Sequence, residues 1–531
     1  MDFNFLTGVK PRKYQESIFN TGIKKNCLVV LPTGLGKTLI ALMLSVERMK
    51  AFPGQKVVFL APTKPLAEQH LEYFKKNLTE LFGSLELFTG SVSASKRKKI
   101  WQTADIIFST PQCVANDLKN GLYDLSEVCL LVEDEAHRCI KNYDYNYVAQ
   151  KYKEQAENPR ILGMTASPGS DEKKIKEICK NLSIEAVELR TREHEEVSPY
   201  VQELTFKKIY VELPEKFIEI KNALRSLFIE YTEELKARKF LWEAPSKGNL
   251  IRLQKKIMAS ISRGHKNFNT LLAASACAQA IRIQHALELL ETQTQESLNK
   301  YLRELFKQAA SKKNRGITRL VAKPAFNKAF TLSNELIARG IEHPKLEKLI
   351  EVVQEEYEKN PNSKIIVFSQ FRDTARLISR KLNEIKGVRA KVFVGQTKKT
   401  TLGVGKRKGI EETTGLSQKE QKSVINNFAE GKINVLCATS IGEEGLDIPE
   451  VNEVIFYEPV PSAIRAIQRA GRTARLQEGR LIMLITKNTR DEVHFYASRA
   501  KEKRMHSAIK NIKEDLSNGR FSTKDIQRRL D

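Results

Sequence analysis

The sequence predicts an α/β protein in which two parallel-sheet domains flank an all-helical segment. Three observations indicate this arrangement. Short, continuous apolar runs alternate with helical patterns in the first two hundred residues, and only helical periodicity continues from 214 to 340. Apolar runs of the first kind return after residue 360. The chain has 531 residues, which is room for about three or four domains rather than for one core.

Continuous apolar runs bounded by turn residues are typical of strands that are buried on both faces of a parallel sheet. Five runs predict the first sheet: NCLVVL (26–31), KVVFLAP (56–62), DIIFST (105–110), CLLVE (129–133) and RILGMTA (160–166). Helical patterns between them complete β–α–β units. Five later runs predict the second sheet: KIIVFS (364–369), AKVFVG (390–395), INVLCAT (433–439), EVIFYE (453–458) and RLIMLIT (480–486).

Between the two predicted sheets, apolar residues recur at helical spacing. The clearest series contains Ile220, Leu224, Leu227, Phe228, Tyr231 and Leu235. We therefore divide the chain into a first sheet domain at 1–200, an all-helical insert at 201–342, and a second sheet domain at 343–500. A polar helical tail is expected at 501–531.

The formal net charge is +25, and this surplus favours a polyanionic partner, because each neutralised phosphate releases bound counterions. By itself the charge is also compatible with an unspecific basic surface. The insert concentrates it, with ten Lys or Arg against one acid at 236–282 and nine against one at 300–328. Two such runs favour a nucleic-acid groove over a merely solvated face.

The seven cysteines have wide, irregular spacings and form no C-x-x-C pair, so a zinc site is not expected. Most lie in apolar stretches and are interpreted as reduced core residues of a cytosolic or nuclear protein. The sequence contains no apolar run of about 18 residues and no signal pattern at its start. Neither a membrane association nor secretion is therefore expected.

The segment LPTGLGKT (31–38) lies between a predicted strand and a predicted helix, as a phosphate-binding loop requires. Its residues Thr33, Gly34, Leu35 and Gly36 are expected to surround phosphate oxygens with backbone N–H groups. Lys37 supplies positive charge near the β and γ phosphates, and Thr38 offers its hydroxyl to Mg²⁺. The alternative is an ordinary glycine-containing turn.

The tetrapeptide DEAH (134–137) directly follows the strand CLLVE. Asp134, at a strand end, is expected to hold Mg²⁺, and Glu135 to orient or activate the attacking water as general base. His137 is a candidate link to neighbouring motifs. Glu133 is unusual, because an apolar residue is commoner at that place. Acidic tetrapeptides are common on surfaces, and only the position after a phosphate loop favours the catalytic interpretation.

The segment QRAGRTAR (468–475) places Arg472 and Arg475 three residues apart, on one face if it is helical. Arginines from a second domain can neutralise charge on a transferring phosphoryl group, and we expect Gln468, Arg472 and Arg475 in this catalytic role. Taken alone, the segment would be better interpreted as a basic surface helix.

In this order, the motifs make the sequence resemble the superfamily 2 helicases throughout. The matching segments are PRKYQ (11–15, the adenine-reading motif), LPTGLGKT (motif I), APTKPLAEQH (61–70, Ia), STPQ (109–112, Ib), DEAH (II), TAS (165–167, III), IVFSQFRDTA (366–375, IV), ATSIGEEGLDIP (438–449, V) and QRAGRTAR (VI). The helical insert and HPKLEKL (343–349) are similar to one branch of that superfamily. It contains archaeal Hef, the Fanconi anaemia M protein and the RIG-I-like receptors, and the resemblance is strongest to the helicase portion of Hef.

This resemblance implies that both sheet domains are RecA-like and that ATP binds between them. Arg12 and Gln15 would contact the adenine, and Gly445 and Asp447 would approach the nucleotide from the second domain. Five residues would grip the nucleic-acid backbone: Thr63, Lys64, Thr110, Arg372 and Thr439. Each of the five could instead be a helix cap or a solvent-exposed charge with no functional role. Hef continues into a nuclease domain, whereas no nuclease-type acidic cluster follows motif VI here, so we expect a shortened chain or a nuclease-free relative.

The sequence therefore predicts an ATP- and Mg²⁺-dependent DNA helicase or translocase that remodels branched or forked DNA during replication-fork repair. It would act in the cytoplasm of a prokaryote, such as an archaeon, or in a nucleus, with a nuclease or repair factors as candidate partners. Two rivals remain: an ATPase activated by duplex RNA, and a structure-specific DNA-binding scaffold with weak ATPase activity. The set Lys37, Asp134, Glu135, Arg472 and Arg475 argues against the scaffold. The absence of a C-terminal zinc-binding cysteine set favours DNA.

Overall fold

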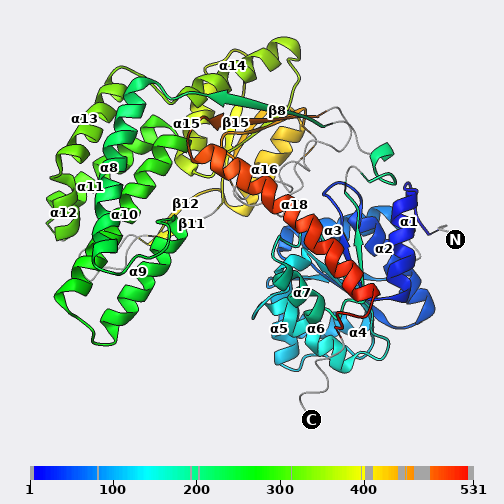
Figure 1. Ribbon diagram of the computed structural model, residues 1–531. Helices are drawn as coiled ribbons and strands as arrows, with labels where there is room; N and C mark the ends of the chain where they lie inside the picture. The colour runs from blue at the N-terminus through cyan, green and yellow to red at the C-terminus, as the bar shows by residue number, and fades with distance from the viewer. Residues whose placement is uncertain are drawn as a thin grey trace.

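The computed structural model describes residues 5–79, 83–191, 194–200, 204–312, 314–395, 397–400, 411–439, 449, 451–459 and 479–523. Figure 1 shows two α/β domains and a bundle of helices, with the second α/β domain between the bundle and the first domain. Among the described helices, none is both long and apolar enough to cross a membrane.

The first domain is a seven-stranded, fully parallel sheet with the order β3-β4-β2-β5-β6-β1-β7. Its strands are β1 (Cys27–Val30), β2 (Lys56–Leu60), β3 (Leu85–Phe88), β4 (Ile106–Ser109), β5 (Val128–Asp134), β6 (Ile161–Thr165) and β7 (Ala186–Leu189). The five expected strands are confirmed and form its centre. The two strands that the apolar runs missed, β3 and β7, are its edges.

Helices cover both faces of this sheet, and the strand residues alternate between two apolar clusters. Leu28 and Val30 of β1 belong to one cluster, and Cys27 and Val29 to the other, as the two-residue period of a strand requires. The helices are α1 (Lys13–Lys24), α2 (Lys37–Ala51), α3 (Lys64–Asn77), α4 (Ala94–Thr103), α5 (Pro111–Lys119), α6 (Asp144–Gln155) and α7 (Glu172–Asn181). The carboxyl ends of the central strands therefore meet at one edge.

The second domain is a six-stranded parallel sheet with the order β10-β13-β9-β14-β15-β8. Its strands are β8 (Leu204–Val211), β9 (Ile365–Phe368), β10 (Ala390–Phe393), β13 (Val435–Ala438), β14 (Glu453–Phe456) and β15 (Gly479–Thr486), and helices α14 (Pro344–Lys359), α15 (Arg372–Leu382) and α16 (Gln418–Ala429) accompany them. A separate antiparallel pair joins β11 (Thr397–Thr400) to β12 (Glu411–Thr414). The five expected strands are again confirmed.

Strand β8 differs from the sequence division, which placed 201–342 in the helical insert. It pairs in parallel with β15 over all eight residues and closes the edge of the second sheet. Its sequence LTFKKIYV mixes polar and apolar residues because an edge strand is covered on fewer sides than a central one. The second sheet thus begins with β8 before the insert, and its other strands follow the insert in the chain.

The insert is helical throughout its described residues from 214 to 340, as expected. It contains α8 (Glu215–Ala237), α9 (Lys247–Ser262), α10 (Phe268–Thr292), α11 (Gln295–Ala310), α12 (Arg315–Val321) and α13 (Pro324–Ala338). The apolar series that begins with Phe217, Ile220 and Leu224 packs into a core of its own. Both main sheets are built without any strand from this bundle.

The last described helix, α18 (Arg490–Ser517), connects the two α/β domains (Figure 1). At 28 residues it is about 42 Å long. It starts at the end of β15, and its distal residues Met505, Ala508, Ile509 and Ile512 are buried in the apolar cluster of the first domain. An ion pair between Lys176 and Asp515, at 3.1 Å, fixes its far end. Residues 501–517 of the expected polar tail are thus the second half of a helix that joins the domains, and residues 524–531 of that tail lie outside the described residues.

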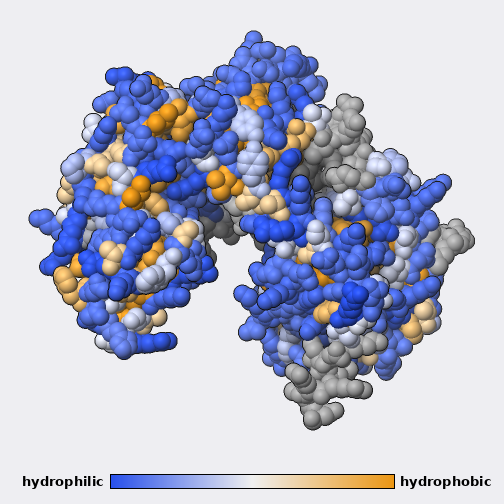
Figure 2. Space-filling model, in the orientation of Figure 1, coloured by the Kyte–Doolittle hydropathy of each residue, from blue (hydrophilic) through white to orange (hydrophobic). Residues whose placement is uncertain are grey.

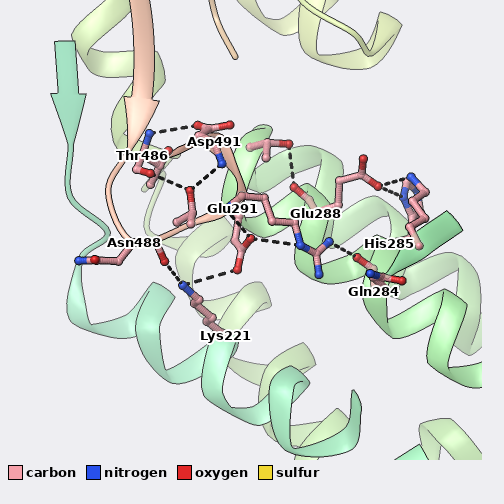
Figure 3. A network of polar contacts seen from close by, with 12 residues as sticks. Lys221, Gln284, His285, Glu288, Glu291, Thr486, Asn488 and Asp491 are labelled. Carbon is pink, nitrogen blue, oxygen red and sulfur yellow. Dashed lines mark hydrogen bonds and ion pairs between the residues drawn. The ribbon is translucent and has the colours of Figure 1, made fainter. Parts of the chain in front are cut away.

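Buried polar contacts fasten the insert to the second domain. Lys345, on α14, has no exposed side-chain surface, and its Nζ lies 2.8 Å from Asp491 Oδ2 and 2.7 Å from the Thr292 carbonyl. Figure 3 shows the adjoining network, in which Glu291 of α10 lies 3.5 Å from both Lys221 and Arg490. The insert, β15 and the start of α18 therefore form one polar junction.

Candidate active site

The phosphate loop lies between β1 and α2, at the carboxyl edge of the first sheet. Gly34 and Gly36 have φ angles of 86° and 76°, in the left-handed region that favours glycine. A Cβ added at Gly36 would overlap the side-chain amide of Gln15. The glycine at 36 is therefore required both by its backbone conformation and by the packing of Gln15.

Side chains of the segment PRKYQ (11–15) support this loop. Gln15, 3% exposed, accepts a hydrogen bond from the Arg12 N–H at 2.8 Å and donates one to the Leu35 carbonyl at 3.1 Å. The Tyr14 hydroxyl donates to the same carbonyl at 2.9 Å. Arg12 packs its guanidinium over the ring of Tyr200, 4.9 Å from the centroid. Gln15 thus has a loop-supporting role that its motif did not reveal.

Lys37 and Thr38 form the first turn of α2. The Lys37 ammonium bends back over the loop and donates to the carbonyls of Leu31, at 2.7 Å, and Pro32, at 3.4 Å. The Thr38 hydroxyl lies 3.4 Å from Nδ1 of His70. The Lys37 ammonium therefore faces the loop, and the Thr38 hydroxyl faces His70 of α3.

Asp134, the last residue of β5, is joined to Thr38 through His70. Nε2 of His70 lies 2.9 Å from Asp134 Oδ2, and both side chains are buried. Burial alone favours the protonated carboxyl, but the hydrogen bond and charge of His70, with Lys37 nearby, outweigh it, and the pKa of Asp134 is lowered. Asp134 is thereby held as a carboxylate, and the His70 ring links it to the hydroxyl of Thr38. A carboxylate and a hydroxyl are oxygen ligands of the kind that Mg²⁺ takes.

Glu135 adopts a left-handed backbone conformation, with φ 53° and ψ 45°. For a residue with a side chain this conformation costs on the order of 1 kcal/mol or more, and such strain gathers at functional sites. Its Oε2 lies 3.2 Å from Nδ1 of His137. The same nitrogen lies 3.1 Å from the hydroxyl of Thr165, in the TAS segment. The expectation that His137 links this site to a neighbouring motif is confirmed.

The chain of contacts continues from Thr165 to the C-terminal helix. The Thr165 hydroxyl accepts from the Ser167 N–H at 3.1 Å, and the Ser167 hydroxyl donates to Sδ of Met505 at 2.8 Å. Met505 belongs to α18, which starts in the second domain. The surroundings of Glu135 are therefore in physical contact with an element that both domains share.

Glu133, which the sequence marked as unusual, is completely buried one residue before Asp134. Burial raises the pKa of its carboxyl group well above the usual 4.5, and Cys139 and Lys153 offset this only in part. Burial therefore favours the protonated form of Glu133. Its side chain lies on the opposite face of β5 from that of Asp134, as neighbouring strand residues do.

Thr63 and Thr110 precede α3 and α5 at the carboxyl ends of the adjacent strands β2 and β4. Neither hydroxyl caps its own helix, so the interpretation of these residues as side-chain caps is not supported. The Thr63 hydroxyl is buried and has no hydrogen-bond partner in the described part of the chain. Lys64, beside it, pairs with Glu68 at 3.5 Å.

Two further nucleic-acid candidates lie in the second domain. Arg372 is the first residue of α15 and donates to the Gly395 carbonyl at 2.7 Å. Thr439 follows β13 and is 4% exposed, with its N–H bound to the Phe393 carbonyl at 3.1 Å. Arg372 therefore supports the end of β10, and Thr439 is largely covered.

Comparisons with known proteins agree with this geometry. Residues 12–175 match the model of the DEAD/DEAH box helicases, and 344–477 match the helicase conserved C-terminal domain. Residues 216–339 match a model described as "Putative ATP-dependent RNA helicase, helical bundle". The crystal structure of the Pyrococcus furiosus Hef helicase domain has 41% sequence identity and a TM-score of 0.71, over 92% of this chain and 98% of that one.

The chain belongs to the Hef and Fanconi anaemia M branch of the superfamily 2 helicases. A Methanocaldococcus jannaschii protein named "Putative ATP-dependent RNA helicase MJ1505" is 37% identical over 95% of this chain and 61% of its own length. The mouse Fanconi anemia group M protein homolog is 32% identical over 96% of this chain and 26% of its own length. The chain thus spans less than two thirds of these relatives.

Five residues that the family motifs single out lie outside the described residues: Gly445, Asp447, Gln468, Arg472 and Arg475. The first-domain half of the family's site is described in full, and it brings Lys37, Thr38, Asp134 and Glu135 to one edge of the sheet. The roles of His70, Ser167 and Met505 were missed. His70 is the last residue of the segment APTKPLAEQH, and a histidine within an expected motif could have indicated its role. Nothing in the sequence indicates the role of Met505.

Proposed function

We propose that this chain is an ATP-driven DNA helicase or translocase that remodels branched or forked DNA. The observation that carries the proposal is its likeness to the Hef helicase domain over nearly that whole domain, insert included. The Schizosaccharomyces pombe relative fml1, 31% identical, is named an ATP-dependent DNA helicase. The family and the proposed chemistry agree on ATP as the energy source.

In this proposal Asp134 and Thr38 would hold Mg²⁺. The lowered pKa of Asp134 and the nearby Thr38 hydroxyl fit such an ion. When bound, the ion neutralises charge on the phosphates. Lys37 would leave its carbonyl partners for the phosphates, and Glu135 would orient the attacking water as general base.

The second domain would supply Arg472 and Arg475 to the transferring phosphoryl group, with Gln468, Gly445 and Asp447 beside the nucleotide. A nucleotide contacted from both domains favours their closure, and hydrolysis removes that contact. Repeated closing and opening can move the domains along a strand. Helix α18 would bend or slide during each cycle, because its two ends are fixed in different domains.

The nucleic-acid path would run past Thr63, Lys64 and Thr110 in the first domain and Arg372 and Thr439 in the second. Such backbone contacts position a strand without reading its sequence. Figure 2 shows an open space between the insert and the first domain, below the second domain. Duplex arms of a fork would lie against the basic insert.

The second candidate is an RNA-activated ATPase. It is supported by the printed names of the helical-bundle model and of the M. jannaschii relative, both of which mention RNA helicases. A weakly active scaffold is less well supported, because the groups around Asp134 are paired and aligned rather than eroded. The proposal and its two rivals predict different stimulation of ATP hydrolysis by DNA and by RNA.

The test compares ATP turnover with no nucleic acid, with forked DNA, with linear duplex DNA and with duplex RNA, at equal phosphate concentrations. We expect the strongest stimulation by forked DNA. Stronger stimulation by duplex RNA would replace the proposal with the RNA-activated ATPase. Turnover that no nucleic acid stimulates would support the scaffold.

A further inference from the structure

Two aromatic side chains of the insert are almost fully exposed. Trp242 has 81% of its surface in solvent, and Phe268 has 78%. Among the described residues they are the most exposed of the large apolar side chains. Isolated exposed apolar residues need no explanation, but two rings at this level in one small region call for a partner.

Each ring lies within four residues of a contact between α8 and α10. Arg238, at the end of α8, donates to the side chain of Asn269, in the first turn of α10, at 2.8 Å. Trp242 follows Arg238 by four residues, and Phe268 directly precedes Asn269. Phe240 and Leu241 pack on the core of the bundle, whereas Trp242 does not. The rings are therefore held on an anchored framework. We call residues 238–271 the insert tip.

The insert tip also carries cations that have nothing to neutralise them. Five exposed basic side chains form no ion pair with any described residue: Lys239, Lys255, Lys256, Arg263 and Lys266. The single acid of this stretch, Glu243, lies 3.6 Å from Arg252. The field around the two rings is therefore strongly positive.

Helix α9 continues the same pattern along its outer face. Ile251, Lys255 and Met258 are exposed and recur at helical spacing, so an apolar–basic–apolar stripe faces solvent. Phe268 and Leu271 are three apart on α10, and Leu271 is 49% exposed. Apolar and basic side chains thus alternate over the whole tip.

The alternation of rings and cations matches nucleic acid whose bases are unstacked. Phosphates would neutralise the five cations, and a base released from its pair would offer an aromatic face to each ring. An intact duplex offers phosphates but no free base faces, whereas a junction offers both. An apolar protein partner would leave the cations unsatisfied, and an acidic one would leave the rings without stacking partners.

We propose that the insert tip is a junction-reading site, at which Trp242 and Phe268 stack on unpaired bases where the arms of branched DNA meet. Lys255, Lys256 and Arg263 hold the adjoining phosphates. The proposal rests on the proposed function and deepens it by assigning the preference for branches to two side chains. It makes no use of the contacts around Asp134.

The chain itself contains a reporter for the test, since Trp242 is one of only two tryptophans. The other, Trp101, is 7% exposed and stacked on Tyr123 at 3.9 Å in the first domain. In a Trp101→Phe background, Trp242 is the only source of indole emission. We expect its emission to be quenched on titration with a three-way junction or fork, and to change little with a linear duplex of equal length.

The second part of the test measures DNA affinity in the protein that retains Trp101. Trp242→Ala and Phe268→Ala are each expected to weaken fork binding about 5- to 150-fold while leaving the affinity for linear duplex nearly unchanged. Because a ring releases no counterions, the salt dependence of fork binding stays as in the original protein. Lys255→Ala, by contrast, should lower the log–log salt slope by about 0.9. Tyr496→Ala, which removes an exposed ring of α18, is the matched control and should change neither quantity.

The outcomes separate this proposal from the proposed function. If forks stimulate ATP turnover but Trp242 emission and the Trp242→Ala affinity are unchanged, the tip proposal alone is overturned. Equal quenching by fork and linear duplex overturns it as well. An emission change that depends on protein concentration without DNA would assign the tip to contact between copies of the chain instead. Absence of any fork-stimulated turnover in the original protein contradicts the proposed function, whatever the tip does.

Discussion

The Asp134 site and the insert tip place their polar groups in opposite settings. Asp134 and His70 are buried and bonded to each other, so their orientation is fixed before any ligand arrives. Lys255 and Trp242 are exposed, and Lys255 forms no ion pair with a described residue. Hydrolysis needs preorganised groups aimed at one transition state. A sequence-independent grip needs charge and ring faces that adapt to whichever bases are present.

The two regions are nevertheless connected through buried polar contacts and helix α18. Lys345, paired with Asp491 in the second domain, binds the Thr292 carbonyl of the insert, and α18 runs from that junction to Met505 beside Ser167. A displacement of the insert by DNA would therefore be transmitted to the surroundings of Glu135. Connection of this kind allows DNA binding and ATP turnover to influence each other.

The largest effect is expected from the arginines of the second domain. We predict that Arg472→Ala and Arg475→Ala each lower kcat by about 10³- to 10⁵-fold, because an arginine finger acts mainly on transition-state charge. Steady-state turnover and ATP affinity, measured together, check this. Weak ATP binding with a normal kcat would show that these residues do not act on the transferring phosphoryl group.

Glu135→Gln tests the catalytic region without touching the insert. We predict a fall in kcat of about 10²- to 10⁴-fold with ATP affinity and fork affinity retained, because the amide keeps the shape and loses the base. The measurements are single-turnover hydrolysis and equilibrium binding of a labelled fork. A collapse of ATP affinity would make Glu135 a structural or metal-binding residue.

The junction between the regions is tested by Lys345→Met. The change leaves Asp491 buried without its cation, and we predict a loss of about 3–5 kcal/mol in the free energy of unfolding of the second domain. Chemical denaturation measures it. Combination with Asp491→Asn should recover part of the loss, because the remaining buried group is then neutral. No recovery would show that Lys345 acts through packing alone.

A pH-dependent effect is expected at Glu133. Its pKa is raised in the folded state, so the folded protein keeps a proton that the unfolded chain releases above its usual 4.5. Stability therefore falls as pH rises above this value, by up to about 1.4 kcal/mol per unit. Glu133→Gln should remove the slope, and its stability advantage over the original protein should grow as the pH is raised above 4.5.

Glu453 is the matched buried acid in the second sheet. Burial raises its pKa to about 7, so the advantage of Glu453→Gln should grow with pH and level off above about pH 7. Denaturation of both variants over the same pH series makes the comparison. A pH-independent difference for Glu133→Gln would show that its carboxyl group is ionised in the fold.

The sequence predicted the central strands because they are apolar on both faces, as in CLLVE and KIIVFS. It missed β3, β7 and β8, which are three of the four edge strands of the two main sheets, and found the fourth, β10, through the apolar run AKVFVG. LTFKKIYV in particular mixes polar and apolar residues and directly precedes helical periodicity, so it was grouped with the insert. Edge strands are defined by their neighbours, and those lie nearly three hundred residues away in β15.

The candidate site likewise contains residues that the sequence predicted and contacts that it missed. Lys37, Thr38, Asp134 and Glu135 were predictable because each belongs to a short motif with fixed chemistry. The links from His70 to Asp134 and from Ser167 to Met505 join segments 64 and 338 residues apart, and no local pattern records them. Trp242 and Phe268 were not singled out either, since an aromatic residue in a helical segment is usually core, and only its exposure distinguishes it.

Strand separation on a labelled fork tests the central claim most directly. The fork carries a fluorophore and a quencher on its two arms and is mixed with the protein, Mg²⁺ and ATP. The account predicts ATP-dependent separation or movement of the branch, which Lys37→Ala abolishes while it still binds the fork. A fork that stays unchanged in the presence of ATP hydrolysis, or that opens equally well with Lys37→Ala, would contradict an ATP-driven motor on branched DNA.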